Sequence, residues 1–211
     1  MIDFNKETDY KDFDHDGLLA HANDCKNCAL HEGRTNVVFH SGHPNADLML
    51  IGEGPGQQED EEGVPFVGRS GQLLTKILES VQIHRDDIYI ANTVKCRPPN
   101  NRTPNPSEMA ACSDYLIRQI QLVEPKIICL VGSAAIKAIL GKTESISKIR
   151  GQWITASVGY MSDELYIMPI FHPAYLLRNS SKEKGAPKWL TWNDMKEVKA
   201  ALSFYDIMSK Q

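Results

Sequence analysis

The sequence predicts an α/β protein in which a mainly parallel sheet lies between two layers of helices. Two observations lead to this fold class. Segments with strand character alternate along the chain with segments of helical periodicity. The strand segments are apolar at every position, not only at alternate ones, which is typical of parallel strands covered by helices on both faces. The length of 211 residues suits one domain with a full core.

The N-terminal half begins with residues 1–12, which we expect to be loosely ordered, followed by a short helix over 13–24. The apolar run at 47–51 predicts the first strand. Residues 70–81 predict an amphipathic helix, because Leu, Ile and Val recur on one face. The apolar run at 88–91 predicts the second strand.

The second half opens with a loop over 97–104, which is rich in Pro and Asn. A helix is expected to begin after Asn105 and to end near residue 123. Asn105 can cap this helix, Pro106 suits its first position, and Glu108 can bond back to the cap. The remaining predicted elements are a strand at 126–131, a helix at 133–140, strands at 153–158 and 165–171, and a helix at 187–208.

The composition, with 42% hydrophobic and 24% charged residues, is ordinary for a soluble globular protein. The net charge is −4, and residues 1–24 carry seven acidic side chains against two lysines. The chain from residue 126 onward has an excess of basic residues, which suits either phosphate binding or a solvated mixed surface. No apolar run is long enough for a membrane span, and the N-terminus lacks a basic-then-apolar leader, so we expect a cytoplasmic protein without membrane association.

A glycine-rich turn, Gly-Glu-Gly-Pro-Gly at 52–56, follows the first predicted strand. It is neither a dinucleotide fingerprint, because Gln57 stands where the third Gly is needed, nor a phosphate loop, because no Gly-Lys-Ser/Thr follows. Glu53, Asn92 and His172 each lie at the carboxyl end of a predicted strand. Parallel sheets bind ligands at that edge, so we expect the three side chains to share one crevice.

The chain contains five cysteines, and the odd number together with the missing leader argues against a disulfide framework. Cys25 and Cys28 form a C-x-x-C motif, and Cys96 and Cys112 follow in a predicted loop and a predicted helix. Four such thiolates fit either a tetrahedral zinc ion or an iron–sulfur cluster, and spacing does not decide between them. A thioredoxin-like redox pair would require the motif at a strand-to-helix junction, which is absent here. Cys129 lies within a predicted strand and is expected to be buried and inert.

Three ordered blocks of sequence resemble the family 4 uracil-DNA glycosylases, and the resemblance extends over about residues 25–178. The blocks are 52–56 with Glu59, Asp60, 63–68 and 71–74; 92–102; and 172–178. The resemblance implies a four-stranded, parallel sheet between helices and a [4Fe–4S] cluster held by Cys25, Cys28, Cys96 and Cys112. We expect a monomer with one domain over 25–211, preceded by an acidic and partly ordered segment over 1–24, whose charge sets it apart.

By the same resemblance, the activity is base-excision repair, in which the enzyme hydrolyses the N-glycosidic bond of uracil in DNA and leaves an abasic site. Uracil must first be flipped out of the base stack, and Phe66 would stack on the flipped base. Asn92 would read uracil O4 and N3–H, a pattern that cytosine reverses. Gly52 and Gly54 complete the implied substrate-binding residues.

The resemblance assigns two catalytic residues. His172 would donate a hydrogen bond to uracil O2, which stabilises the departing anion, and Glu53 would position or activate the attacking water. The segment of Tyr175, Leu176, Leu177 and Arg178 resembles the loop that contacts DNA and fills the gap left by the flipped nucleotide. Gly56 stands where other uracil glycosylases carry a Tyr that blocks the methyl group of thymine, so the resemblance does not explain how thymine is excluded.

Three other classes of protein share some of these features. A zinc deaminase would need H-x-E and P-C-x-x-C, and neither occurs. Related proteins that trap uracil-DNA covalently carry a Lys/Arg-rich insertion ending in His after the second block, and residues 96–104 lack it, which favours turnover. A cluster-bearing nucleic-acid-binding or scaffold protein is the third alternative, and it requires that the pocket residues do not converge. Uracil-containing DNA is the expected partner.

Overall fold

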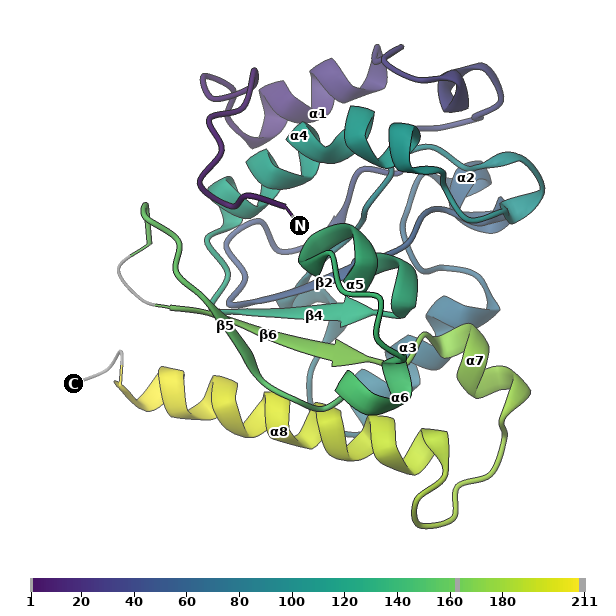
Figure 1. Ribbon diagram of the computed structural model, residues 1–211, viewed down its shortest axis with the longest axis vertical. Helices are drawn as coiled ribbons and strands as arrows, with labels where there is room; N and C mark the ends of the chain where they lie inside the picture. The colour runs from purple at the N-terminus through teal and green to yellow at the C-terminus, as the bar shows by residue number, and fades with distance from the viewer. Residues whose placement is uncertain (1, 162–163, 209–211) are drawn as a thin grey trace.

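The computed structural model describes residues 2–161 and 164–208, and within them the chain forms an αβα sandwich around one sheet (Figure 1). The described sheet has six strands in the order β1-β3-β2-β4-β6-β5. Their bounds are β1 Ser41–Gly42, β2 Leu48–Gly52, β3 Tyr89–Asn92, β4 Ile127–Val131, β5 Ile154–Ala156 and β6 Leu165–Ile170.

The four central strands, β3, β2, β4 and β6, are all parallel to one another. This confirms the predicted mainly parallel, four-stranded core of the sheet. The two edge strands β1 and β5 pair antiparallel with their neighbours and extend the sheet beyond the prediction. The sequence gives no signal for β1, because a strand of two residues is too short to show any periodicity.

The helices agree with the sequence wherever they are long enough to show a hydrophobic period. Those predicted are α1 His15–Asn23, α3 Arg69–Glu79, α4 Pro106–Val123, α5 Ser133–Leu140 and α8 Pro187–Met208. Those not predicted are α2 Gln57–Glu62, α6 Ile146–Ile149 and α7 Pro173–Arg178, together with short 3-10 turns at Ala29–Glu32, Arg85–Asp87 and Pro99–Asn101. The start of α4 is as expected, because Asn105 and Glu108 form a reciprocal capping box.

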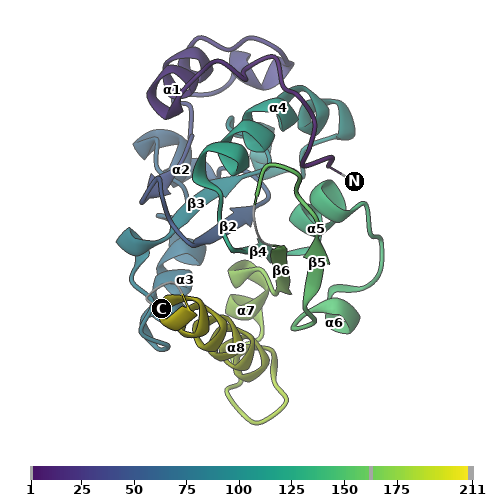
Figure 2. The ribbon, with the colours of Figure 1, turned by 90° about the vertical axis from the view of Figure 1, so that its left-hand side faces the viewer.

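Helices cover both faces of the sheet, which explains why its central strands are apolar throughout. Figure 2 shows α1 and α4 above the sheet and α3 and α8 below it. Along β4, Ile128 and Leu130 belong to the core that includes α4 and α5. Their neighbours Ile127, Cys129 and Val131 belong to the core that includes α3 and α8. Every position of such a strand is buried, so selection for apolar residues acts on each one.

The acidic N-terminal segment is packed against the domain. Residues 2–12 contain no helix or strand, but Phe4 and Tyr10 are buried. The backbone N–H of Ile2 donates to the carbonyl of Ile139 at 2.9 Å. The expectation of a loosely ordered segment is therefore wrong for these residues, because apolar side chains spaced among the acids give it a buried side. Among the described residues, no helix has both the length and the hydropathy of a membrane span.

A buried ion pair fixes α8 to the segment that follows α6. The guanidinium of Arg150 contacts both carboxylate oxygens of Asp194, with Nε 2.8 Å from Oδ2, and Asp194 is only 2% exposed. Asp194→Asn leaves the Arg150 charge without its counter-charge, and we expect it to lower the free energy of unfolding by about 3 kcal/mol. Urea denaturation measures the change. Glu7→Gln, which removes the solvent-exposed pair with Lys11, is the control and should produce no measurable change.

Candidate active site

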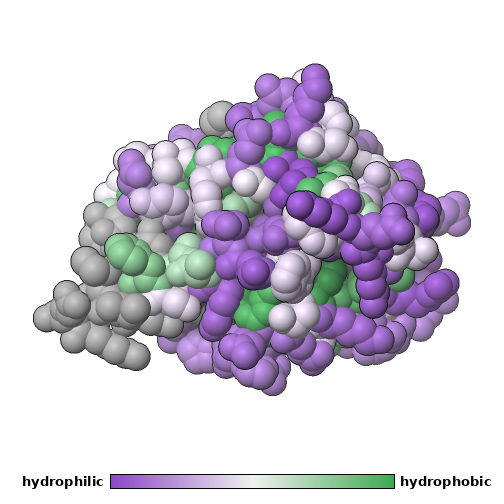
Figure 3. All heavy atoms as spheres, turned by 90° about the horizontal axis from the view of Figure 1, so that it is seen from below, coloured by the Kyte–Doolittle hydropathy of each residue, from purple (hydrophilic) through white to green (hydrophobic). Residues whose placement is uncertain are grey.

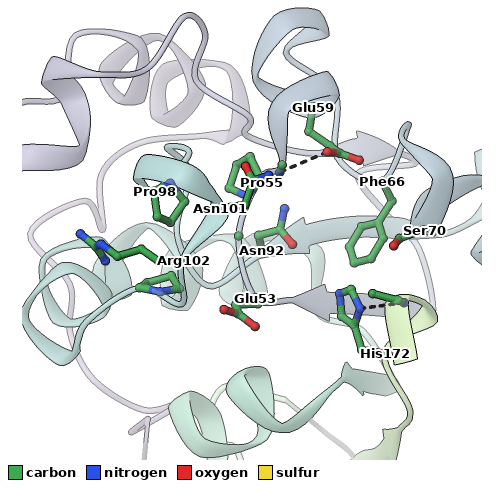
Figure 4. Close-up of a pocket in the computed structure, with 14 residues that line it drawn as sticks. Glu53, Pro55, Glu59, Phe66, Ser70, Asn92, Pro98, Asn101, Arg102 and His172 are labelled. Carbon is green, nitrogen blue, oxygen red and sulfur yellow. Dashed lines mark hydrogen bonds between the residues drawn. The ribbon is translucent and has the colours of Figure 1, made fainter. Parts of the chain in front are cut away.

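A pocket of about 320 Å³ opens at the carboxyl ends of β2, β3 and β6, and five predicted site residues line it (Figure 4). These residues are Glu53, Gly54, Phe66, Asn92 and His172. The expected crevice therefore exists, and the predicted side chains converge on it although they lie more than 100 residues apart in sequence.

Gly52 lies beneath the pocket and permits the close approach of two other residues. In the parallel register of β2 and β3 it is paired with Asn92. A Cβ at position 52 would stand 2.4 Å from Asn92 Oδ1 and 2.4 Å from Phe66 Cζ, distances that real atoms do not adopt. Glycine is thus required here because any side chain would displace the amide or the ring.

Asn92 is the last residue of β3 and is 2% exposed. Its backbone carbonyl accepts a hydrogen bond from Lys95 Nζ at 2.8 Å. In the described part of the chain, its side-chain amide has no hydrogen-bond partner, although it borders the pocket. A nearly buried amide without a partner can supply one donor and one acceptor to a ligand.

Glu53 directly follows β2, and its carboxylate points into the cavity (Figure 4). The backbone at this position is held by β3, because the carbonyl of Glu53 accepts hydrogen bonds from Thr93 Oγ1 and from the N–H of Val94. The backbone hydrogen bonds fix where the side chain starts, so the carboxylate is presented from a rigid base.

His172 is the N-cap of α7, and its Nδ1 accepts a hydrogen bond from the N–H of Ala174 at 3.1 Å. An accepting Nδ1 assigns the ring proton of the neutral imidazole to Nε2. Burial lowers the pKa of His172, the Arg178 charge lowers it further, and the Glu59 carboxylate acts in the opposite sense. At neutral pH the pocket therefore contains an uncharged imidazole with one N–H to donate.

Phe66 is held in place by residues on both sides. It adopts a left-handed conformation with φ of 55°, which is uncommon for a bulky residue. The Glu59 carboxylate accepts from the N–H groups of Val67 at 3.0 Å and Gly68 at 2.8 Å. From the other side, the Arg85 guanidinium donates to the carbonyl of Phe66 at 2.6 Å. The ring lies 6.1 Å from the His172 ring, centroid to centroid.

Several pocket residues were not among the predicted site residues. They are Pro55, Gly56, Glu59, Ser70, Pro98, Asn101, Arg102, Pro104 and Ala174. Glu59 could have been found, because it lies three residues after Gly56 and bonds back to its N–H at 3.1 Å, as an N-terminal cap would. The lining residues of the loop over 97–104 could not have been found from the sequence. Which of them face the pocket depends on the folded conformation of the loop, which includes the ion pair of Arg102 with Glu108.

The predicted DNA-contacting segment forms the short helix α7 instead of a loop, and one of its four residues does not fit the assignment. Tyr175, Leu177 and Arg178 are exposed at the surface. Leu176 has no exposed surface, since it occupies the inward side of the helix. The prediction of Leu176 as a DNA contact is therefore wrong for this structure.

The four candidate metal-binding cysteines are brought together around one small cavity of about 20 Å³, lined by Cys25, Cys28, Cys96 and Cys112. Arg34 Nη1 lies 3.3 Å from Cys96 Sγ. Among the described residues, no three His, Cys, Asp or Glu side chains are grouped closely enough to hold a single metal ion. Cys129 is separate and fully buried in β4, as expected.

Lys95 lies between the cysteines and the pocket and is fully buried. Burial lowers its pKa to about 8, while the charges of Cys112 and Cys96 act to raise it. Burial raises the pKa of Cys112 to about 12, and Lys95 opposes that rise. The ammonium and the sulfurs thus stabilise each other's charged forms.

The fold and the pocket define a member of the uracil DNA glycosylase superfamily, whose sequence model matches residues 39–196. The chain is 48% identical over 160 residues to the Type-4 uracil-DNA glycosylase of Thermotoga maritima, covering 75% of this chain and 81% of the relative. It is 43% identical over 185 residues to the Type-4 uracil-DNA glycosylase of Saccharolobus solfataricus, covering 85% of this chain and 82% of the relative. The Type-5 uracil-DNA glycosylase of Pyrobaculum aerophilum is 30% identical over 159 residues, covering 67% of each chain. This chain belongs to the type-4 uracil-DNA glycosylases.

The lowered pKa of His172 can be measured by NMR titration of its imidazole, with His172→Gln identifying the resonance. We expect a value below the ordinary 6.5. Because the folded state disfavours the protonated form, the neutral ring contributes stability above pH 6.5, and this contribution is lost as the pH falls through the lowered pKa. A measured pKa above 6.5 would contradict the neutral assignment.

Proposed function

We propose that this chain removes uracil from DNA by hydrolysing the N-glycosidic bond, leaving an abasic site, and that the residues of the pocket described above perform the reaction. The observation that carries the proposal is the meeting of a free amide, a neutral imidazole, an aromatic ring and a carboxylate in one pocket. The chain's membership of the type-4 uracil-DNA glycosylases supports the same activity.

Recognition of the base rests on Asn92, Phe66 and Gly54. A uracil flipped out of the duplex loses its stacking, and the ring of Phe66 replaces part of it. The free amide of Asn92 donates to O4 and accepts from N3–H. Cytosine presents the reverse pattern and would leave buried polar groups unpaired, so it is rejected. Gly54 lets the backbone approach the edge of the base.

In the chemical step, the bond between the sugar C1′ and uracil N1 breaks, and its electron pair leaves with the base. His172 donates its Nε2–H to O2, where negative charge develops. Glu53 faces the positive charge that develops on the sugar, and its carboxylate orients the water that attacks C1′. Burial favours the neutral imidazole, and this form still carries the Nε2–H that donates to O2.

Contact with the rest of the DNA is assigned to α7. Tyr175 and Leu177 provide the apolar surface that fills the space left by the flipped nucleotide, and Arg178 is placed to bind a phosphate. We also propose a monomer as the active form, with residues 25–211 as the catalytic domain and residues 1–24 as an acidic segment docked on it.

A [4Fe–4S] cluster is the cofactor that the four cysteines fit best. Such a cluster takes four thiolates, one on each iron, and the four cysteines that line one cavity supply that set. The chain's membership of the type-4 uracil-DNA glycosylases favours the cluster over a zinc ion. Cluster binding would tie Cys96 and the loop after it to Cys112 on α4, which gives the cluster a structural role, since glycosidic hydrolysis transfers no electrons.

Asn92→Ala and His172→Ala should each reduce uracil excision by about 10²-fold or more, because each removes a contact to the base or to the departing anion. The assay is strand scission by alkali after incubation with uracil-containing and thymine-containing oligonucleotides. His84→Ala, at an exposed histidine, is the control and should retain full activity. Unchanged excision in the pocket variants would remove these role assignments.

Cys28→Ala should yield protein with much less iron and without the absorbance of an iron–sulfur cluster, because one of four ligands is lost. Cys129→Ala is the matched control, since this thiol is fully buried within β4, away from the other four. Iron content per chain and visible absorbance are measured for both variants. Equal iron in the two variants would contradict the assigned ligand set.

A further inference from the structure

A groove of about 400 Å³ lies between α3 and α8, outside the catalytic pocket. Leu73 and Ile77 of α3 and Trp189 and Trp192 of α8 form its apolar surface. We call it the α3–α8 groove. Figure 3 looks onto the face that carries α8 and shows hydrophobic residues exposed between hydrophilic ones.

The polar surroundings of the α3–α8 groove are basic. Lys76, Lys182 and Lys188 line it, and none of its described lining residues carries a carboxylate. Within the described chain, none of these three lysines forms an ion pair. A fourth lysine, Lys196, places its Nζ 4.6 Å from the centroid of the Trp192 ring. Unpaired ammonium groups around aromatic surfaces suit a ligand with both negative charges and flat rings.

The groove is continuous with the DNA-contacting face proposed above. The helix α3 begins beside the catalytic pocket, which Ser70 lines, and it lines the groove from Leu73 onward, with Ser80 just past its end at the far side. From Ser70 to this far side the chain rises ~15 Å, which corresponds to about four nucleotides of a strand that rises about 3.4 Å per nucleotide. On the other side, the segment 179–186 leads from α7 to α8 and carries Lys182 (Figure 1).

We propose that the α3–α8 groove binds the DNA strand that flanks the flipped uracil. Bases of this strand stack on Trp192 and Trp189, and its phosphates bind Lys76, Lys182 and Lys188. The inference rests on the proposed function and adds a second subsite to it. Lysines alone would also suit an acidic protein segment, but two tryptophans beside them and the continuity with α7 favour a nucleic acid strand.

The test compares a short oligonucleotide of about five nucleotides, which extends only about two nucleotides from the lesion and does not span the groove, with one of about 15 that spans it. Each carries a central tetrahydrofuran abasic analogue for binding by fluorescence anisotropy, and a central uracil for kinetics. Trp192→Ala should weaken binding of the long oligonucleotide by about tenfold and leave the short one unchanged. Trp153→Ala is the matched control, because Trp153 and Trp192 are each 37% exposed.

A second variant keeps the test informative if Trp192→Ala fails to fold. Lys188→Gln should lower the slope of log K against log salt for the long oligonucleotide by about 0.7, the value of one lost phosphate contact. Lys137→Gln is its control, because this exposed lysine lies on α5, over the opposite face of the sheet.

Three results are decisive. The subsite is supported if Trp192→Ala weakens binding of the long oligonucleotide but not of the short one, and Trp153→Ala does not. It is also supported if Lys188→Gln lowers the slope of log K against log salt and Lys137→Gln does not. Equal behaviour of groove and control variants on the long oligonucleotide overturns it and leaves the groove to another ligand, such as an acidic protein segment. Wild-type protein that excises no uracil from either oligonucleotide contradicts the proposed function, while the binding measurements still decide the groove.

Discussion

The pairing of Gly52 with Asn92 across two parallel strands is the constraint on which the rest of the site depends. It places the Asn92 amide beside the pocket and next to the residue directly before Glu53 in the neighbouring strand, and this arrangement requires that position 52 has no side chain. The Phe66 ring and the Asn92 oxygen occupy the space where a Cβ would stand. The absence of a Cβ at position 52 thus sets how closely the Asn92 amide and the Phe66 ring approach each other.

The cysteine site and the pocket are linked through the chain that leaves β3. Three residues separate Asn92 from Cys96, and one of them, the buried Lys95, donates a hydrogen bond to the Asn92 carbonyl and also lines the cysteine cavity. The charges of Cys112 and Cys96 favour the protonated form of Lys95. The loop after Cys96 forms one wall of the pocket, and the ion pair of Arg102 with Glu108 also stabilises this loop. Fixing the position of the Cys96 sulfur therefore helps to fix that wall of the pocket.

The fold could be predicted where local sequence and tertiary environment agree. The strands of the sheet are buried on both faces, so their apolar character is continuous and easily recognised. The capping box at Asn105 marks the start of α4 from sequence alone. The helices α2, α6 and α7 escaped prediction because four to six residues form fewer than two turns, too few for the hydrophobic pattern to repeat. Contacts from distant segments, such as that of Asp60 with Thr35, stabilise α2.

Local sequence was enough to predict the alternation of strands and helices, the placement of Glu53, Asn92 and His172 at strand ends, and the set of four cysteines. These features depend on the order of residues along the chain, which the sequence shows directly. Tertiary packing, in contrast, buries Leu176 while its neighbours are exposed, and it brings Glu59 to the Phe66 loop. It alone also created the α3–α8 groove, whose two walls are more than 100 residues apart. Burial and convergence are properties of packing between distant segments, and one sequence does not display them.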